Sequence, residues 1–227
     1  MANKKLEAHL ETKNLITAQK KNRAHKINDK VSFSFEEKGV QMFHDIIDYL
    51  DVEHSPRYKQ ESTKTFCNIY AYDFCSFTWA YLPRVYWDKN ALKTLAEGKE
   101  VKTLYGKTVR ELSANMLYDF LVGIGKTEHD WEEIQDTVEL QKLANEGHVC
   151  IICAKRKDAR RSGHITVVAP EHGNYMRKGL VPVQSQAGAT NYKYKSGNNW
   201  YLSKNYSNYG FFVNRRPSEL TFKGDAS

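Results

Sequence analysis

The sequence lacks the features that mark membrane and secreted proteins. Its 227 residues contain no apolar run close to the length of a membrane span. The first thirty residues alternate charged residues with short apolar patches, and they lack the continuous hydrophobic stretch of a secretory signal. We therefore expect a soluble globular chain with no membrane span and no signal peptide, made in the cytoplasm.

Cysteine is also scarce. The four cysteines, Cys67, Cys75, Cys150 and Cys153, are too few and too irregularly spaced for a disulfide framework. Cys150 and Cys153 form a C-x-x-C pair, but they lie within the apolar run VCIICA and no second pair of ligands accompanies them. A buried strand explains this pair better than a metal site does, so we expect no metal and no cofactor.

Positive charge is concentrated at one end of the chain. The net charge is +7, and residues 1–30 hold eight Lys and Arg against three Asp and Glu, so this segment carries +5 of it. We predict that residues 1–33 form a basic arm, flexible or helical. The arm is either a solvated tail or a contact for a polyanion such as DNA, anionic lipid or an anionic cell-wall polymer.

Hydrophobic periodicity predicts helices in the first half of the chain and strands in the second. Residues 82–87, LPRVYW, interrupt the helical pattern and predict a loop that lines a cleft. The two halves therefore predict one α+β domain over residues 34–218, followed by a C-terminal tail at 219–227. Helical spacing covers residues 35–51, 64–78, 109–125 and 131–147, and short β-rich runs cover 148–156, 163–170, 180–188 and 210–216.

Cys67 begins the apolar face of the helix predicted at residues 64–78, for which Thr63 and Thr65 are possible caps. In the first turn of a helix, unpaired backbone N–H groups and the helix dipole favour a thiolate over a thiol. Cys67 is therefore a candidate nucleophile. The alternative is ordinary core packing, because free cysteine is among the most buried residue types.

A cysteine nucleophile needs an imidazole base and a polar group that orients the ring. His164 opens a predicted strand directly after Gly163, which permits close approach of another backbone. It is better placed than the other candidate histidines, His129, His148 and His172.

The orienting group should lie on the next strand. In VPVQSQAG, Gln184 and Gln186 share one face of the strand and Ser185 lies on the other. We choose Gln186 as the third catalytic residue, because its carbonyl oxygen can accept a hydrogen bond from the ring of His164. A different strand register would favour Gln184 or Ser185 instead.

Several motifs together resemble those of phage and bacterial peptidoglycan hydrolases of the papain-like NlpC/CHAP superfamily. The resemblance covers about residues 56–213, and its main elements are TFCNIYAYDF, GHITVVAP and PVQSQAG. It implies a papain-like fold, in which the cysteine lies at the N-terminus of a helix packed on an antiparallel sheet. It also implies a lysin-like activity, in which Cys67 and His164 cleave an amide bond of peptidoglycan through a thioacyl intermediate.

The resemblance also suggests supporting roles for other residues. The oxyanion would be held by the Cys67 backbone N–H and by a further donor, the Asn68 side chain or the Tyr70 hydroxyl. We expect a monomer that reaches the wall after release or delivery by another system. The predicted substrate-binding side chains are Arg84, Tyr86, Trp87, Gln184 and Tyr192, with Trp200 beside them.

Two other functions use the same residues differently. A papain-like toxin or effector would act on a protein by proteolysis or deamidation, with the same Cys67 and His164. A non-catalytic module would bind a polyanion through its basic arm, and Cys67 would then be packing. Selective alkylation of Cys67 near neutral pH would favour the enzyme.

Overall fold

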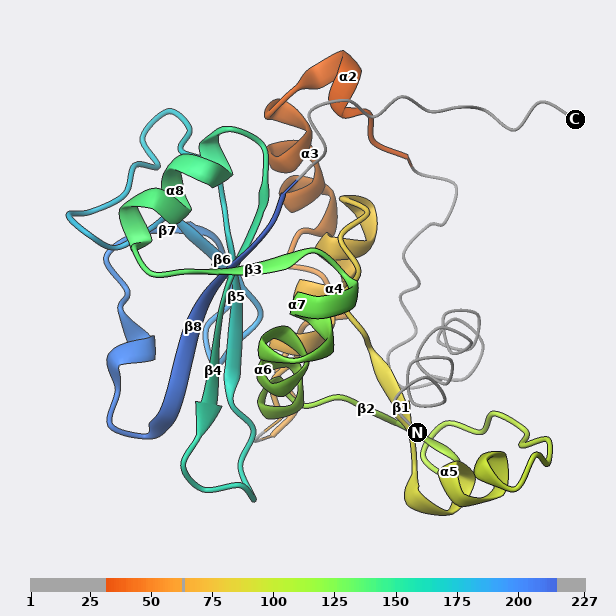
Figure 1. The fold of residues 1–227 in the computed structure, drawn as a ribbon. Coiled ribbons are helices and arrows are strands. Elements are labelled where there is room, and N and C mark those ends of the chain that lie inside the picture. The colour runs from red at the N-terminus through yellow and green to blue at the C-terminus, as the bar shows by residue number, and fades with distance from the viewer. Residues whose placement is uncertain (1–31, 63, 216–227) are drawn as a thin grey trace, which may run out of the picture.

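The chain folds around a six-stranded antiparallel sheet that carries helices on both faces (Figure 1). This computed structural model describes residues 32–62 and 64–215. The predicted α+β class is confirmed. The predicted arm and C-terminal tail lie almost entirely outside the described residues, as does the possible cap Thr63. Phe33, which was assigned to the arm, packs its ring against Tyr49 and Phe77 at centroid distances of 5.7 and 5.3 Å.

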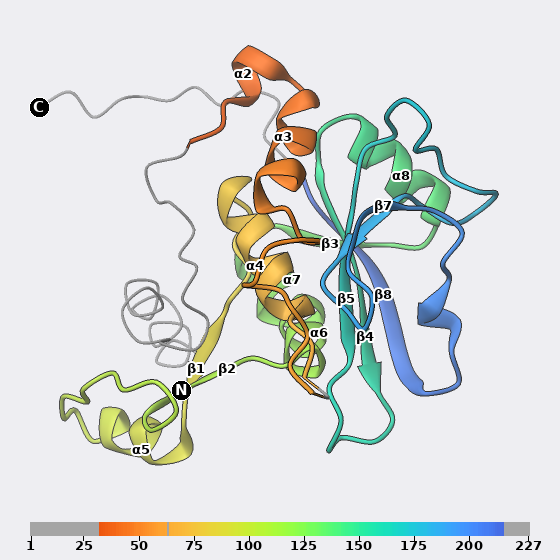
Figure 2. The same ribbon diagram turned by 180° about the vertical axis from the view of Figure 1, so that it is seen from behind.

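One face of the sheet is covered by a layer of helices, which Figure 2 shows from behind. The helix predicted at 35–51 is divided at Gly39, whose φ of 56° lies in the left-handed region. The helices of this layer are α2 (Phe35–Lys38), α3 (Gln41–Leu50), α4 (Cys67–Phe77), α6 (Ala114–Val122) and α7 (Ile124–Glu128).

The strands of the sheet follow the order β3-β8-β4-β5-β6-β7. The four runs predicted as strands all contribute, and β7 was not predicted. The strand bounds are β3 (Trp131–Ile134), β4 (Val149–Arg156), β5 (His164–Val168), β6 (Gln184–Gln186), β7 (Tyr192–Lys195) and β8 (Tyr206–Asn214).

The helix predicted over 131–147 is wrong in its first part. Residues Trp131–Ile134 form β3, which pairs with β8, and the indole of Trp131 is buried and donates to the carbonyl of Tyr81 at 2.8 Å. Helix α8 (Thr137–Asn145) begins only after Asp136, whose side chain accepts from the backbone N–H of Val138. Long-range strand pairing therefore overrides the local helical pattern.

Side chains of the sheet alternate between two cores. Ile151 and Cys153 of β4 join the core beneath α4 and α6, whereas Cys150 and Ile152 join the core beneath α8. The two cysteines of the C-x-x-C pair are thus buried on opposite faces of the sheet, and they cannot share one metal ion.

The predicted cleft loop at 82–87 is also corrected. Strand β1 (Val85–Trp87) pairs with β2 (Val109–Glu111), and together with α5 (Lys89–Ala96) they form a small unit that projects from the body (Figures 1 and 2). Trp87 packs in the core of this unit, against Ala91 and Val109. Because β2 occupies the start of the predicted 109–125 helix, α6 begins later, after the cap Ser113.

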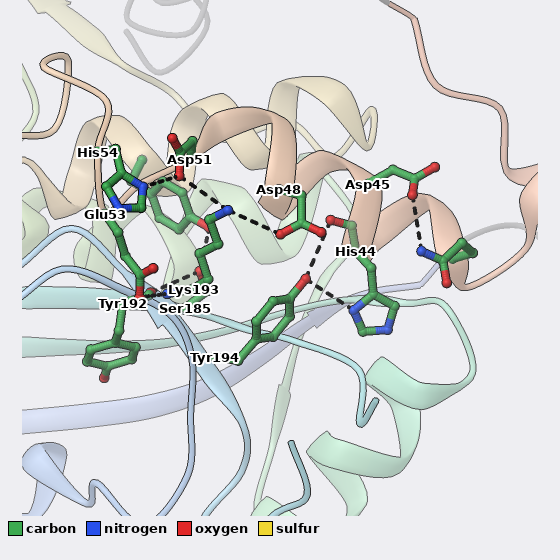
Figure 3. Close-up of polar contacts among 12 residues, drawn as sticks. His44, Asp45, Asp48, Asp51, Glu53, His54, Ser185, Tyr192, Lys193 and Tyr194 are labelled. Carbon is green, nitrogen blue, oxygen red and sulfur yellow. Dashed lines mark hydrogen bonds and ion pairs between the residues drawn. The ribbon is translucent and has the colours of Figure 1, made fainter. Parts of the chain in front are cut away.

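Helix α3 is tied to the edge strand β7 by polar contacts (Figure 3). The ammonium of Lys193 lies 3.3 Å from a carboxylate oxygen of Asp48 and 3.2 Å from one of Asp51. The hydroxyl of Tyr194 lies 3.3 Å from Nδ1 of His44. These contacts close the sheet edge against the helical layer. In the part of the chain that the structure describes, no helix has the length and apolar character needed to cross a membrane.

Candidate active site

Cys67 is the first residue of α4, as the sequence predicts. The N-cap residue is Phe66, whose side chain makes no capping hydrogen bond, so Thr65 does not cap this helix. The backbone N–H groups of Asn68 and Ile165 lower the pKa of the Cys67 thiol. These donors and the helix terminus both favour negative charge on the sulfur.

His164 is the first residue of β5 and lies beside the end of β4. It pairs with Ala154 of β4, and a side chain at the preceding Gly163 would place its Cβ only 2.0 Å from the Ala154 carbonyl oxygen. Only glycine fits this close approach. The prediction that Gly163 allows the backbones to meet at His164 is confirmed.

Gln186 fixes the tautomer of the histidine. Its Oε1 lies 2.5 Å from Nε2 of His164, while its own Nε2 donates to the carbonyl oxygen of Thr190 at 2.9 Å. Because the amide nitrogen is committed to that carbonyl, the amide oxygen faces the ring and Nε2 of His164 carries a proton. The other ring nitrogen, Nδ1, is left for the hydrogen bond between His164 and Cys67.

Cys67 and His164 perturb each other's ionisation. Burial alone raises the pKa of the Cys67 thiol, but the charge of His164, its hydrogen bond and the two backbone donors bring this pKa below the ordinary value. Burial alone lowers the pKa of His164, but the charge and hydrogen bond of Cys67 and the bond to Gln186 raise it overall. The two shifts together favour a thiolate–imidazolium pair.

Gln184 supports the site from within the core. It is fully buried, and its Oε1 accepts from the indole N–H of Trp200 at 2.8 Å and from the hydroxyl of Thr166 at 3.1 Å. The ring of Trp200 packs edge-on against His164 at a centroid distance of 4.5 Å. Gln184 therefore holds Trp200 in place. Both ends of its amide are engaged in the fold, and it does not line the pocket beside His164, so it does not contact substrate as predicted.

A pocket of about 660 Å³ opens beside His164 and Gln186. The predicted aromatic residues Tyr192 and Trp200 line it. Cys67 is not among the residues that line the pocket, and 3% of its surface is exposed. Lining residues that the sequence interpretation missed are Gln60, Arg156, Arg160, Arg161, Lys195 and Tyr206.

The other predicted residues lie elsewhere. The Asn68 side chain donates to the carbonyl of Leu112 at 2.8 Å, and the buried Tyr70 hydroxyl lies 2.5 Å from Oγ of Ser185. Both groups are therefore engaged in the fold and do not face the pocket as oxyanion donors. The backbone N–H of Cys67, at the first position of α4, is one of those that a helix leaves without an intrahelical partner. Gln60 lines the pocket, and its side-chain amide donates to the carbonyl of Ser62 at 2.8 Å.

Arg84, Tyr86 and Trp87 do not reach the pocket. The guanidinium of Arg84 is buried and lies 3.2 Å from Glu111 and 3.8 Å from Asp73. Trp87 is buried in the projecting unit, and Tyr86 packs against the main core. The prediction failed because pairing of β1 with β2 turns this segment into packing surface.

The site therefore brings a cysteine of lowered pKa and a histidine held by Gln186 beside a pocket. Within residues 32–62 and 64–215, no group of three or more His, Cys, Asp and Glu side chains is placed to hold a metal ion. No model of a known protein family matches the chain, and no curated protein matches it either. The function must be argued from the site itself.

Proposed function

We propose that the protein is a cysteine hydrolase that cleaves an amide bond, with Cys67 as nucleophile and His164 as general acid and base. The observation that carries this proposal is the convergence of three side chains from α4, β5 and β6. Burial of the pair strengthens its electrostatic coupling, since the interaction between the two charges is weakly screened there. A packing cysteine needs neither an imidazole partner nor a fixed tautomer.

In the first half of the reaction, the Cys67 thiolate attacks the carbonyl carbon of the substrate. The resulting oxyanion accepts a hydrogen bond from the Cys67 backbone N–H. The proton on Nδ1 of His164 passes to the amide nitrogen as the C–N bond breaks. The amine leaves and a thioester remains on Cys67.

In the second half, His164 is neutral and accepts a proton from water, which attacks the thioester carbonyl. The C–S bond then breaks, so the carboxylic acid product leaves and the thiolate–imidazolium pair is restored. Gln186 keeps Nε2 protonated throughout, which reserves Nδ1 for both proton transfers.

The substrate we propose is peptidoglycan, in keeping with the resemblance to papain-like NlpC/CHAP hydrolases. The order of Cys67, His164 and Gln186 on one helix and two neighbouring strands supports a papain-like arrangement. Tyr192 and Trp200 in the pocket supply aromatic surfaces suited to a sugar or a peptide.

Mass spectrometry of purified peptidoglycan digested by the wild type and by Cys67→Ala tests this proposal. Paired new amino and carboxyl termini, absent with Cys67→Ala, are expected and would identify the bond. Cys75→Ala is the matched control, because Cys75 is buried on the same helix and burial alone raises the pKa of its thiol. This control should digest the wall as the wild type does.

Other outcomes would redirect the proposal. Release of ammonia from a protein glutamine, with an intact wall, would favour the deamidase. An unreactive Cys67, together with no product from any amide substrate, would favour the non-catalytic module.

A further inference from the structure

Among the described residues, the pocket beside His164 is lined by four cationic side chains, Arg156, Arg160, Arg161 and Lys195, and by no carboxylate. Three of these come from the hairpin that joins β4 to β5, and Lys195 ends β7 on the far side of Gln186. The charge is therefore local to the site. It is carried by residues other than those that give residues 1–30 their excess of positive charge.

Two of the cations are held in position by aromatic rings of the same pocket. The guanidinium carbon of Arg156 lies 5.1 Å from the ring centroid of Tyr206, and its Nε donates to the carbonyl of Ser162 at 3.3 Å. The ammonium of Lys195 lies 5.5 Å from the ring centroid of Tyr192. Cations placed in this way lose little side-chain freedom when an anion binds.

Helix α6 fixes the base of the hairpin. Oδ1 of Asn115 accepts from the backbone N–H of Arg156 at 2.9 Å, and its Nδ2 donates to the carbonyl of Arg161 at 2.9 Å. Both arginines that flank the hairpin are therefore anchored to the layer of helices that includes α4, which carries Cys67.

The cations differ in their partners. Arg160 forms an ion pair with Asp158 at 3.0 Å, which offsets its charge. Among the residues that the structure describes, no carboxylate lies within ion-pair distance of Arg156, Arg161 or Lys195. Burial is the largest influence on the pKa of His164, and the charge of Arg156 adds a smaller lowering, so this guanidinium acts at the catalytic ring.

We propose that the pocket selects a substrate with a carboxylate next to the scissile amide, bound by Arg156 and Arg161 with Lys195 on the other side. This inference rests on the proposed function, and it narrows the substrate class to an acidic peptide. Guanidinium groups bind a carboxylate through paired, charge-assisted hydrogen bonds. A compact pocket at a catalytic dyad suits one small anionic group, whereas a nucleic acid needs a long basic stripe.

Alkylation of Cys67 by iodoacetate and by iodoacetamide tests the inference, because these reagents have nearly the same size and differ in charge. For each variant we would measure the alkylation rate with iodoacetate divided by the rate with iodoacetamide, at low salt, by mass spectrometry of the Cys67 peptide. The ratio should fall by a factor of about 3 in Arg156→Gln and in Arg161→Gln. The rate with iodoacetamide alone shows whether the thiol is still activated.

Two variants serve as matched controls. Arg160→Gln removes the same charge from the same hairpin, but Asp158 already offsets that charge, so the ratio should change less. Lys142→Gln removes an exposed charge on α8 and should leave the ratio unchanged. Equal ratios in the wild type, Arg156→Gln and Arg161→Gln would overturn the inference. So would a loss of binding to DNA in these variants without any change in the ratio.

If Cys67 reacts with neither reagent, binding decides the question. The NMR signal of the Trp200 indole N–H, assigned with Trp200→Phe, should shift when glutarate is added and should not shift with glutaramide. No shift with glutarate would overturn the inference. Both measurements are independent of peptidoglycan cleavage. If the proposed function is wrong, Cys67 would still be alkylated but purified peptidoglycan would not be cleaved.

Discussion

In the proposed mechanism Cys67 and His164 act as one unit, because each shifts the pKa of the other. We expect Cys67→Ala and His164→Ala each to reduce turnover by roughly 1,000-fold or more, with the fold retained. The double variant should lose little more than either single one, since one partner has no function without the other. Kinetics with a soluble amide substrate and circular dichroism measure both effects. Losses that multiply in the double variant would show that the two residues act separately.

The pH dependence of turnover should be bell-shaped. The reactive pair needs Cys67 deprotonated, and its lowered pKa places the acid limb below the ordinary thiol value of 9.0. The pair also needs His164 protonated, and its raised pKa places the alkaline limb above the ordinary histidine value of 6.5. Initial rates measured across a pH range that includes 6.5 and 9.0 show whether the acid limb lies below the alkaline limb. An acid limb at or above 9.0 would show that the thiol is not activated.

Gln186 should act by positioning the ring. Gln186→Ala should lower turnover by a factor of about 10 to 100, because Cys67 and His164 still pair but the tautomer is no longer fixed. Gln186→Glu keeps an acceptor and should be better tolerated, with the alkaline limb of the pH profile moved upward, since a carboxylate stabilises the imidazolium. The pH profile separates this role from a structural one.

Gln184→Ala is the comparison for this series. Gln184 is buried and holds Trp200 and Asn198, so its loss should lower the free energy of unfolding by about 1 to 3 kcal/mol. A silent Gln186→Ala, with all catalytic loss in a still stable Gln184→Ala, would contradict the assignment of Gln186.

At the scale of the elements, the contact between β4 and the start of β5 positions His164, the proposed base. Gly163→Ala would place a Cβ 2.0 Å from the carbonyl oxygen of Ala154 and 2.7 Å from Oδ1 of Asn115. We expect a loss of about 2 to 3 kcal/mol in stability and a larger loss in turnover, because both strands must move at His164. Thermal unfolding and kinetics measure this. Ala159→Ser, an exposed change in the same hairpin, should have neither effect.

At the scale of the whole molecule, most of the net positive charge lies in residues 1–30, outside the described residues. Deleting this segment should leave turnover of small soluble fragments unchanged. Attachment to intact walls or another polyanion should weaken at low salt, because exposed charges act over about one Debye length, roughly 10 Å at 0.1 M. Co-sedimentation with walls tests this. A large loss with small fragments would instead make the segment part of the fold.

The sequence by itself determined the features that depend on short-range patterns. Helical spacing and strand alternation placed Cys67 at a helix start and His164 at a strand start, and the period of two placed Gln184 and Gln186 on one face. The α+β class followed from the same patterns, because local periodicity depends only on neighbouring residues.

Only the tertiary structure decided which side chains meet. Trp131 begins a strand because β3 pairs with β8, more than seventy residues later, and Trp87 is buried because β1 pairs with β2. The cationic pocket wall was missed because KDARRSG has the composition of any polar hairpin. Antiparallel pairing of β4 and β5 brings these arginines beside His164. Tyr206 and Asn115, which are distant in sequence, then hold Arg156 in the pocket wall. These contacts join segments that are far apart along the chain. A local sequence pattern does not say which distant segments will meet, and only folding brings them together.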